Sequence, residues 1–202
     1  MKKYLIFAFC FAVISCKSST EPGTSPSLIM PLAVGNEWDY ATYESDPNYV
    51  QFYDTIRIAN RLVSDSSIFE TLDHNYYKNT SGGLILIDTF YIPKSLILLA
   101  KYPAQPGDFI KHDTNFVYTN PTLTGDEIVD SVTAVVTIPV GTYTCYKYRT
   151  DYYDSKHILH RRDNAYFAIG VGEIKYEVFW LDSASQQLRL SLSKQLTRVI
   201  LH

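Results

Sequence analysis

Short runs of apolar and aromatic residues with a repeat of two constrain the fold of this chain most strongly. Across residues 38–43, Trp38, Tyr40 and Thr42 occupy every second position, and across residues 188–193 three leucines alternate with polar side chains. Alternate side chains of a strand point to opposite faces, so these runs predict strands with one face in a core. Glycine and proline fall between the runs rather than inside them, which is typical of turns. The 17 Tyr and 10 Phe also favour strands over helices.

About ten strands are expected, drawn from residues 38–43, 49–58, 68–72, 76–78, 84–92, 96–102, 115–119, 127–138, 142–153, 157–161, 173–181 and 187–200. A short helix is the alternative for residues 96–102. Residues 120–121 (Asn-Pro) and 125–126 (Gly-Asp) are expected to break the chain between the strands at 115–119 and 127–138. Strands of this length with hairpin-scale connections imply an all-β domain with one curved, largely antiparallel sheet. The periodicity leaves a half-open barrel, a closed barrel and a sandwich open.

The first sixteen residues have the pattern of a bacterial secretion signal. Met-Lys-Lys precedes an uncharged apolar run at residues 4–14. This run is too short to cross a hydrocarbon core, which needs about 20 residues in a helix, but it fits the apolar region of a signal peptide. The run ends in Val13-Ile14-Ser15-Cys16, which resembles the lipobox of bacterial lipoproteins. The resemblance implies cleavage before Cys16 and acylation of that residue, which would hold a membrane essentially permanently. The alternative is an ordinary secretory signal that contains a cysteine.

The residues after Cys16 predict a flexible tether. Residues 17–27 contain no apolar anchor, so nothing offsets the entropy of ordering them. Such a segment reaches roughly 20 Å by coil statistics. Lys17, not Asp, follows the cysteine, and by resemblance to envelope sorting rules this favours the outer membrane over the inner one. We expect the domain to face the periplasm, with the cell surface as the alternative. We expect residues 1–15 to be the signal peptide, residues 16–29 the lipidated Cys16 with its tether, and residues 30–202 a single β domain.

Charge and cysteine content narrow the classes of function. Without the signal peptide, 16 basic and 21 acidic side chains remain, a net charge of about −5. There is no basic patch with interleaved aromatics, so nucleic acid is not expected as a partner. Cys145 is the one unmodified cysteine expected in the mature chain, so no internal disulfide can form. It lies between Tyr143 and Tyr146 with no His close in sequence, which predicts a small core residue rather than a catalytic thiol.

Two segments of the chain echo each other. Residues 31–38 (PLAVGNEW) and 103–110 (PAQPGDFI) each have a Pro, three further residues, a Gly, an amide or acid and an aromatic entering a strand. Each predicts a tight turn at the glycine that directs an aromatic side chain into the core. Internal duplication and two unrelated loops with common turn chemistry both explain the match.

Three further patterns, taken in order, suggest a family. Residues 31–40, 138–146 and 166–177 contain P-L-x-V-G-N-x-W, P-x-G-T-[FY]-x-C and Y-x-A-x-G-V-G-x-[IV]-K. In this order they resemble small bacterial envelope lipoproteins of unknown function, over roughly residues 30–180. The resemblance implies an envelope location and a curved antiparallel sheet, in some cases similar to half-barrel lipoprotein carriers. It implies no reaction and no catalytic residues.

The sequence predicts no catalytic site, metal site or cofactor. His157 and His160 are three residues apart in an expected strand, so they would point to opposite faces and could not share one ion. Residues 73–75 (Asp-His-Asn) are typical of a turn, and no Gly-x-Ser-x-Gly elbow occurs. Residues 170–172 (Gly-Val-Gly) have no expected helix behind them and so form no phosphate cradle. The scattered carboxylates neither identify nor exclude a glycosidase pair.

Tyrosine is the one residue type with a candidate binding role. Tyr146, Tyr148, Tyr152 and Tyr153 are the candidate ligand contacts, with Tyr40, Tyr43, Tyr49 and Tyr53 as further lining of a concave face. Aromatic rings with polar tips suit sugars, peptides or lipid head groups. Strand propensity alone also accounts for them.

We therefore expect a non-catalytic, membrane-anchored lipoprotein that binds a hydrophobic ligand, a glycan or an envelope partner. The alternatives are a hydrolase acting on envelope polymers and a structural subunit of an envelope assembly. An aromatic-lined concavity without convergent ionisable groups would favour binding, whereas two or more titratable side chains that converge in one cleft with perturbed pKa values would favour an enzyme. An exposed apolar patch without a pocket would favour an assembly subunit.

Overall fold

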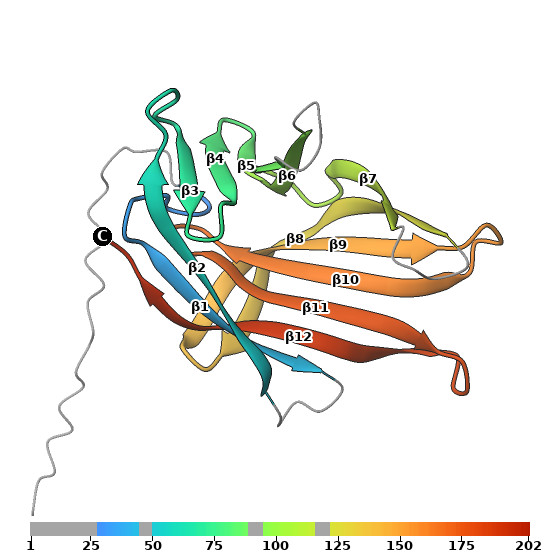
Figure 1. Cartoon of the computed structure of the whole chain (residues 1–202). Coiled ribbons are helices and arrows are strands. Elements are labelled where there is room, and N and C mark those ends of the chain that lie inside the picture. Colours follow the sequence, from blue (N-terminus) through green and yellow to red (C-terminus); the bar gives the residue numbers. More distant parts are fainter. Residues whose placement is uncertain (1–27, 45–49, 89–94, 116–121) are drawn as a thin grey trace, which may run out of the picture.

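The chain forms one antiparallel sheet of twelve strands that curls almost into a barrel (Figure 1). The structure, a computed structural model, describes residues 28–44, 50–88, 95–115 and 122–202. Its strands are β1 (Glu37–Glu44), β2 (Val50–Arg61), β3 (Ile68–Thr71), β4 (Tyr76–Thr80), β5 (Gly83–Asp88), β6 (Ser95–Lys101), β7 (Phe109–Asn115), β8 (Leu123–Ile138), β9 (Gly141–Tyr153), β10 (Leu159–Ala168), β11 (Gly172–Asp182) and β12 (Gln187–Ile200). Within these ranges there is no helix, and hence none that could cross a membrane.

The strands form two meanders of six that meet in the middle of the sheet. Their order is β6-β5-β4-β3-β2-β1-β12-β11-β10-β9-β8-β7. β1 pairs with β12, from Glu37 opposite Ile200 to Glu44 opposite Leu192. β6 and β7 are therefore the two edges of the sheet, and the curl brings them next to each other (Figure 1).

The two meanders begin with the same turn. Gly35 before β1 and Gly107 before β7 have positive φ angles of 94° and 88°, a conformation that favours glycine. The amide of Gly35 donates to the carbonyl of Ile58 in β2 at 2.9 Å, and the amide of Gly107 donates to the carbonyl of Val129 in β8 at 2.8 Å. The amides of Ile58 and Val129 donate back to the residue after each glycine, both at 2.9 Å. The two similar sequence segments thus form equivalent turns at the start of each meander.

The segment before β1 closes one end of the curled sheet. Ile29 and Met30 are buried there, together with Trp38 at the start of β1. The Trp38 indole N–H donates to the carbonyl of Val171 at 2.6 Å, and the Asn79 side chain donates to the carbonyl of Met30 at 2.8 Å. We call this the closed end; β10 ends here, and β1 and β11 begin here. The opposite end, formed by the β9–β10 and β11–β12 turns, we call the far end (Figure 1).

The structure confirms the all-β class and the curved, largely antiparallel sheet, with twelve strands rather than about ten. The closure is a nearly complete barrel, and the segment with a helical alternative is strand β6. A break expected at Gly125 is absent because β8 runs through it. A Cβ at Gly125 would lie 2.6 Å from the carbonyl oxygen of Asp151 in β9. Glycine therefore permits a close approach of β8 and β9 here instead of forming a turn.

Candidate functional site

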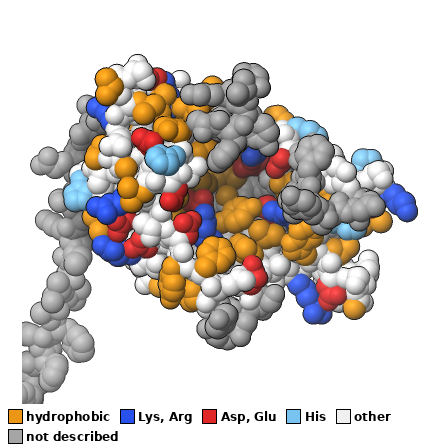
Figure 2. Space-filling view, viewed as in Figure 1, with side chains coloured by type: hydrophobic (Ala, Val, Ile, Leu, Met, Phe, Trp, Pro, Cys, Tyr) orange, Lys and Arg blue, Asp and Glu red, His pale blue; other side chains and the backbone are white. Residues whose placement is uncertain are grey.

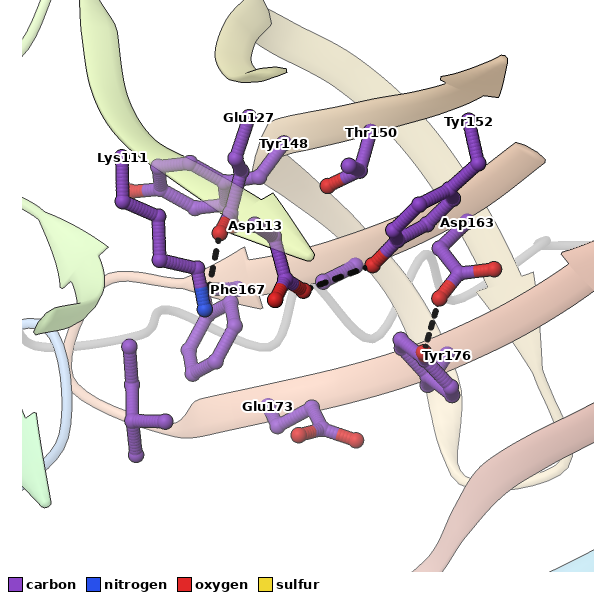
Figure 3. A pocket seen from close by; sticks show the side chains of 12 residues that line it. Lys111, Asp113, Glu127, Tyr148, Thr150, Tyr152, Asp163, Phe167, Glu173 and Tyr176 are labelled. Carbon is purple, nitrogen blue, oxygen red and sulfur yellow. Dashed lines mark hydrogen bonds and ion pairs between the residues drawn. The ribbon is translucent and has the colours of Figure 1, made fainter. Parts of the chain in front are cut away.

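A cavity of about 190 Å³ lies on the concave face of the sheet. Figure 2 shows this side of the molecule hollowed near its middle, where hydrophobic side chains lie beside acidic and basic ones. Six strands, from β6 to β11, supply the lining: Leu99, Lys111, Asp113, Glu127, Tyr148, Thr150, Tyr152, Asp163, Ala165, Phe167, Glu173 and Tyr176. Four carboxylates therefore converge with three tyrosines in one cavity (Figure 3).

Strand alternation directs these side chains inward. In β9, Tyr148, Thr150 and Tyr152 occupy every second position and are all buried. The β9–β10 register places Thr150 opposite Asp163 and Tyr148 opposite Ala165, so neighbouring strands present side chains to the same cavity. The hydroxyl of Tyr148 donates to the carbonyl of Lys101 at 2.8 Å, which ties the cavity wall to the edge strand β6.

Asp163 is held by three hydrogen bonds. Arg161 donates from Nε and Nη2 to its two carboxylate oxygens, both at 2.6 Å, and the Tyr176 hydroxyl donates to Oδ2 at 2.6 Å. The side chains of Arg161 and Asp163 are only 13% and 8% exposed. Burial alone would lower the pKa of Arg161, but the hydrogen bonds and charge of Asp163 outweigh it and hold that pKa above its usual value. Burial and Asp163 likewise raise the pKa of Tyr176.

Arg161 is also stacked between two rings. Its guanidinium carbon lies 5.2 Å from the ring centroid of Tyr152 and 5.2 Å from that of Trp180. Cation–π contacts of this kind strengthen when water is excluded. The guanidinium is therefore fixed by Asp163 on one side and by aromatic faces on the other.

Lys194 occupies a similar position further along the concave face. Its ammonium lies 2.6 Å from Oε1 of Glu173, 4.7 Å from the ring centroid of Tyr40 and 6.0 Å from that of Tyr176. Tyr40 is fully buried, and its hydroxyl donates to the carbonyl of Glu173 at 3.1 Å. Two of the four carboxylates that line the cavity thus have a cation fixed on aromatic rings.

The other two carboxylates lie at the sheet edge: Asp113 belongs to the edge strand β7, and Glu127 to its neighbour β8. Nζ of Lys111 lies 3.3 Å from Oε2 of Glu127, and the Tyr152 hydroxyl donates to Asp113 at 2.8 Å (Figure 3). Burial raises the pKa of Glu127 above its usual value even though Lys111 acts in the opposite direction. Among the described residues Asp113 has this hydroxyl partner but no ion pair. It is therefore the carboxylate with the most capacity to accept a hydrogen bond from a ligand.

The arrangement suits the binding of a polar molecule. Ionised carboxylates accept several hydrogen bonds each, and tyrosine hydroxyls both donate and accept. Burial raises the pKa of Glu127, so this carboxyl binds a proton more readily than an exposed carboxyl does. Within the described parts of the chain, no group of three or more His, Cys, Asp or Glu is placed to hold a metal ion.

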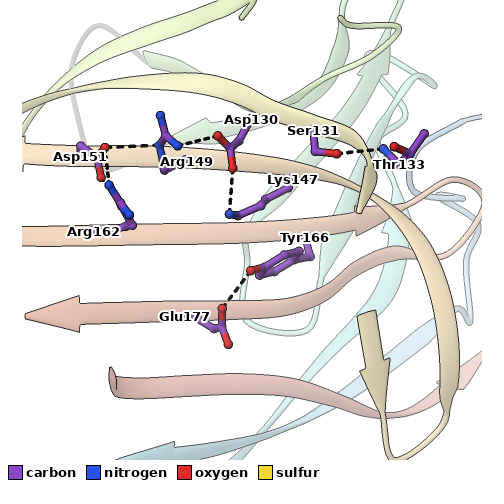
Figure 4. Close-up of polar contacts among 9 residues, drawn as sticks. All are labelled: Asp130, Ser131, Thr133, Lys147, Arg149, Asp151, Arg162, Tyr166 and Glu177. Carbon is purple, nitrogen blue, oxygen red and sulfur yellow. Dashed lines mark hydrogen bonds and ion pairs between the residues drawn. The ribbon is translucent and has the colours of Figure 1, made fainter. Parts of the chain in front are cut away.

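The outer face of the same strands carries a chain of ion pairs instead of a cavity (Figure 4). Arg162 binds Asp151 at 2.5 Å, and Asp151 lies 3.3 Å from Arg149. Arg149 and Lys147 then bind the two oxygens of Asp130 at 2.6 and 2.8 Å. Burial raises the pKa of Asp130, but the two cations outweigh it and leave that pKa below its usual value. Each charge in this chain has a partner, so we assign it a structural role.

The structure separates the four candidate tyrosines. Tyr148 and Tyr152 line the cavity. Tyr146 shares their strand face but packs edge-on against Tyr102, with ring centroids 5.4 Å apart. Tyr153 points to the outer face, where it lines a shallow depression beside His112 and His157. Of the further four, Tyr40 lies on the concave face, Tyr43 is half-buried, Tyr53 is exposed, and Tyr49 lies outside the described residues.

The remaining candidate residues do not join the cavity. Cys145 is buried, and burial raises the pKa of its thiol to about 11, which is the opposite of an activated nucleophile. His157 lies in the β9–β10 turn with a φ of 59°, and His160 pairs with Asp154 at 3.0 Å. Cys16 lies outside the described residues.

Sequence reasoning missed the charged members of the site. Lys111 with Asp113, and Arg161 with Asp163, are pairs of opposite charge two residues apart in strands. Residues at this spacing share a face, so these pairs were a usable signal for a polar inner face. Glu173 and Lys194 carried no such signal, because only the β11–β12 pairing brings them together.

Comparison with solved structures identifies proteins of the same fold. A "putative exported protein with YmcC-like fold" from Bacteroides fragilis matches with a TM-score of 0.54 and 14% identity, over 87% of this chain and 100% of that one. A "putative lipoprotein" from Parabacteroides distasonis matches with a TM-score of 0.50 and 13% identity, over the same shares of the two chains. No protein-family model matches the chain, and no curated protein matches it by sequence. At these identities the likeness establishes the fold alone.

Proposed function

We propose that this protein is a lipid-anchored protein of the bacterial cell envelope that binds a glycan, without chemical change, in the concave cavity. The convergence of four carboxylates and three tyrosines in one cavity carries the proposal. Convergent ionisable groups also meet the criterion given above for an enzyme, but Asp163, Glu173 and Glu127 are each paired with a cation, which favours holding a ligand over transferring protons. Sugar hydroxyls can donate to carboxylates, while the apolar faces of sugar rings pack against aromatic side chains. The three tyrosines and Phe167 supply such rings at the same place as the acceptors.

The lining favours a glycan over a hydrophobic ligand. An acyl chain in this cavity would cover Asp113 and Glu127 without offering them a hydrogen bond, and burying a polar group uncompensated costs roughly 2–7 kcal/mol. Lys111 offsets part of this cost for Glu127, but Asp113 has only the Tyr152 hydroxyl. A polyhydroxylated ligand avoids that cost.

The envelope location is proposed on two grounds. The Val13-Ile14-Ser15-Cys16 sequence resembles a lipobox, and the two solved proteins that share the fold are described as an exported protein and a lipoprotein. Lys17 after the cysteine favours the outer membrane over the inner one. Intact-mass spectrometry of protein purified from bacterial membranes, beside a Cys16→Ala variant, tests the anchor. We expect acyl mass and loss of residues 1–15 in the wild type alone; an unacylated wild type contradicts the proposal.

Glycan binding is tested by calorimetry with oligosaccharides released from the envelope of the producing bacterium. Asp113→Asn removes the charge of the least-paired carboxylate while keeping its size, and we expect binding to weaken about tenfold, because hydrogen bonds to charged groups contribute roughly 1.5–3 kcal/mol. Asp130→Asn on the outer face is the matched control and should bind as the wild type does. Equal affinity of both variants, or fatty acid carried through purification in place of sugar, would contradict glycan binding in this cavity.

One observation favours a second candidate, a hydrolase acting on the same class of polymer. Glu127 has a raised pKa and shares the cavity with Asp113, and a general acid and a carboxylate base are the usual requirements of glycoside hydrolysis. Chromatography of the oligosaccharides after incubation distinguishes the two functions. Shorter products that disappear with Glu127→Gln would establish hydrolysis, whereas recovery of intact ligand leaves binding alone.

A further inference from the structure

We propose that the closed end of the sheet rests on the bilayer that holds the lipid anchor, so that the far end points away from the membrane. The proposal concerns the orientation of the domain and is independent of what the cavity binds. It rests on the acylation of Cys16 put forward above. Its structural basis is the meeting of three features at the closed end.

The first feature is the place where the tether joins the domain. Leu28 is the first described residue, and its carbonyl accepts a hydrogen bond of 2.8 Å from the amide of Gly170 in the β10–β11 turn. The next residue, Ile29, is already buried. Eleven residues, 17–27, therefore separate Cys16 from the closed end, and the tether expected from their sequence would reach roughly 20 Å. The far end is on the opposite side of the molecule from this junction (Figure 1).

The second feature is a group of exposed apolar side chains around that junction. Leu28, Val34, Ile169 and Leu201 are 41%, 53%, 42% and 44% exposed. Backbone contacts bring their segments together: Gly170 binds Leu28, and the amide of His202 donates to the side chain of Asn36 at 2.8 Å. We call these four residues the apolar rim. A single exposed apolar residue is ordinary, but these four come from three separate segments that surround the tether junction.

The third feature is that buried side chains fill the closed end, whereas the cavity lies on the concave face. Met30 packs against Gly172, where a Cβ would lie 3.0 Å from its Cγ, and Trp38 is fully buried beside it. Contact between this end and a membrane would therefore leave the cavity accessible. This is the arrangement required of an anchored protein that binds a ligand from the surrounding space.

The far end has a different surface. Residues 183–186 of the β11–β12 turn (Ser-Ala-Ser-Gln) are small or polar and all exposed. The β9–β10 turn exposes Ser155, Lys156 and His157, followed by one apolar residue, Ile158. Polar turns of this kind stay hydrated, so they give no reason for contact with lipid. The occupant that fits the apolar rim is the interfacial layer of the bilayer, because the short tether holds the rim beside it.

Site-directed fluorescence in proteoliposomes tests the orientation. Acylated protein purified from bacterial membranes is reconstituted with a fluorophore on Val34→Cys, Ile169→Cys or Leu201→Cys, and for the far end on Lys156→Cys or Ala184→Cys. The native thiol of Cys145 is buried. The vesicles contain phosphatidylethanolamine, phosphatidylglycerol and a small fraction of headgroup-labelled nitroxide lipid.

We expect the nitroxide lipid to quench rim probes at least about twofold more than far-end probes, because interfacial groups lie roughly 5–10 Å into the headgroup boundary. Equal quenching at both ends, or stronger quenching at the far end, overturns the orientation while leaving the anchor intact. Missing acyl mass in the purified protein overturns the anchor and the orientation together. Circular dichroism of each variant identifies a substitution that perturbs the fold, and glycan affinity, measured separately, decides the function of the cavity.

Discussion

The concave and outer faces of β8, β9 and β10 use charged residues in different ways. On the concave face, Asp163 and Arg161 form a bidentate pair that is almost fully buried and flanked by the rings of Tyr152 and Trp180. On the outer face, Arg149 joins Asp130 and Asp151 in a chain whose members are 15–34% exposed. Both faces belong to the same strands, so the difference arises from burial and aromatic packing rather than from backbone geometry.

This comparison indicates where the charges affect stability and where they affect binding. Partly exposed ion pairs contribute little because water and salt screen them. A buried pair is expensive to break because the remaining partner is left uncompensated. Burying the charges of the concave face therefore costs desolvation free energy that the partly exposed charges of the outer face do not cost. The buried charges are fixed in position, and a binding site needs polar groups that are fixed.

The largest expected effect is on the concave face. Asp163→Ala should lower the free energy of unfolding by about 3–5 kcal/mol, because it leaves the Arg161 guanidinium buried without its carboxylate. Urea denaturation measures the change. Replacing both partners, with Arg161→Met and Asp163→Leu, should recover most of the loss, since an apolar pair of similar volume needs no charge partner. A loss below about 1 kcal/mol for Asp163→Ala would mean that the Arg161–Asp163 pair contributes no more to stability than the ion pairs of the outer face.

A smaller effect is expected from one cavity hydroxyl. Tyr152→Phe keeps the ring against Arg161 but removes the hydrogen bond to Asp113, and should cost about 1.5 kcal/mol in the free energy of unfolding. The same variant should also weaken glycan binding, because Asp113 would lose its fixed position. Unchanged stability would mean that water replaces the hydroxyl, and that the cavity is more hydrated than the burial of Tyr152 indicates.

On the outer face we expect less. Arg149→Ala removes its pairs with Asp130 and Asp151, yet should cost less than about 1 kcal/mol, and less still in high salt. The same urea experiment at low and high ionic strength provides the measurement. A loss comparable with that of Asp163→Ala would show that the chain of ion pairs stabilises the fold as strongly as the concave face does.

The pH dependence of stability should have opposite signs on the two faces. The pKa of Glu127 is raised by burial, so the folded state binds its proton more tightly than the unfolded state. The stabilisation from that proton is complete below the unfolded pKa, near 4.5, and is lost as pH rises through the higher folded value. For Asp130, whose pKa is lowered, the stabilisation is present above 3.8 and is lost as pH falls through the folded value.

Thermal unfolding from about pH 3 to about pH 7 measures these signs. Relative to Glu127→Gln, the wild type should lose stability as pH rises; relative to Asp130→Asn, it should gain stability over the acid part of the range. The same sign for both variants would remove the electrostatic distinction between the two faces.

Sequence periodicity predicted most of the strands because it is a local property, but it missed β7 (Phe109–Asn115). Of the expected strand 115–119 only Asn115 belongs to β7, and residues 116–119 lie outside the described residues. Trp38, Tyr40 and Thr42 alternate whatever their neighbours are, and all three are buried. Gly125 was misread because a glycine in a turn and a glycine at a close strand contact look alike in sequence. The joining of the two meanders was not predictable, since it depends on the pairing of β1 with β12, which are far apart in the sequence.

The site was less accessible from sequence than the fold. Tyr148 and Tyr152 were among the predicted contacts, and both line the cavity. Tyr146, Tyr148 and Tyr152 are an even number of residues apart in β9, so the sequence places all three on one face of the strand. Nothing in the local sequence shows that Tyr146 packs against Tyr102 instead of lining the cavity. Lys194 contacts Tyr40 across the β1–β12 pairing and Glu173 across the β11–β12 pairing. Both pairings shift register at a bulge, and because a bulge leaves no clear signal in the sequence, these contacts could not be predicted.

The position of β6 and β7 at the two edges bears on self-association. An unpaired edge strand offers its backbone N–H and C=O groups to strands of other molecules. Here the curl turns the two edges toward each other, so each limits access to the other. Uncurling would release both edges at once, together with the exposed side chains of Leu96 and Phe109. Aggregation should therefore begin with the separation of β6 from β7, while the β1–β12 pairing at the centre of the sheet is still intact.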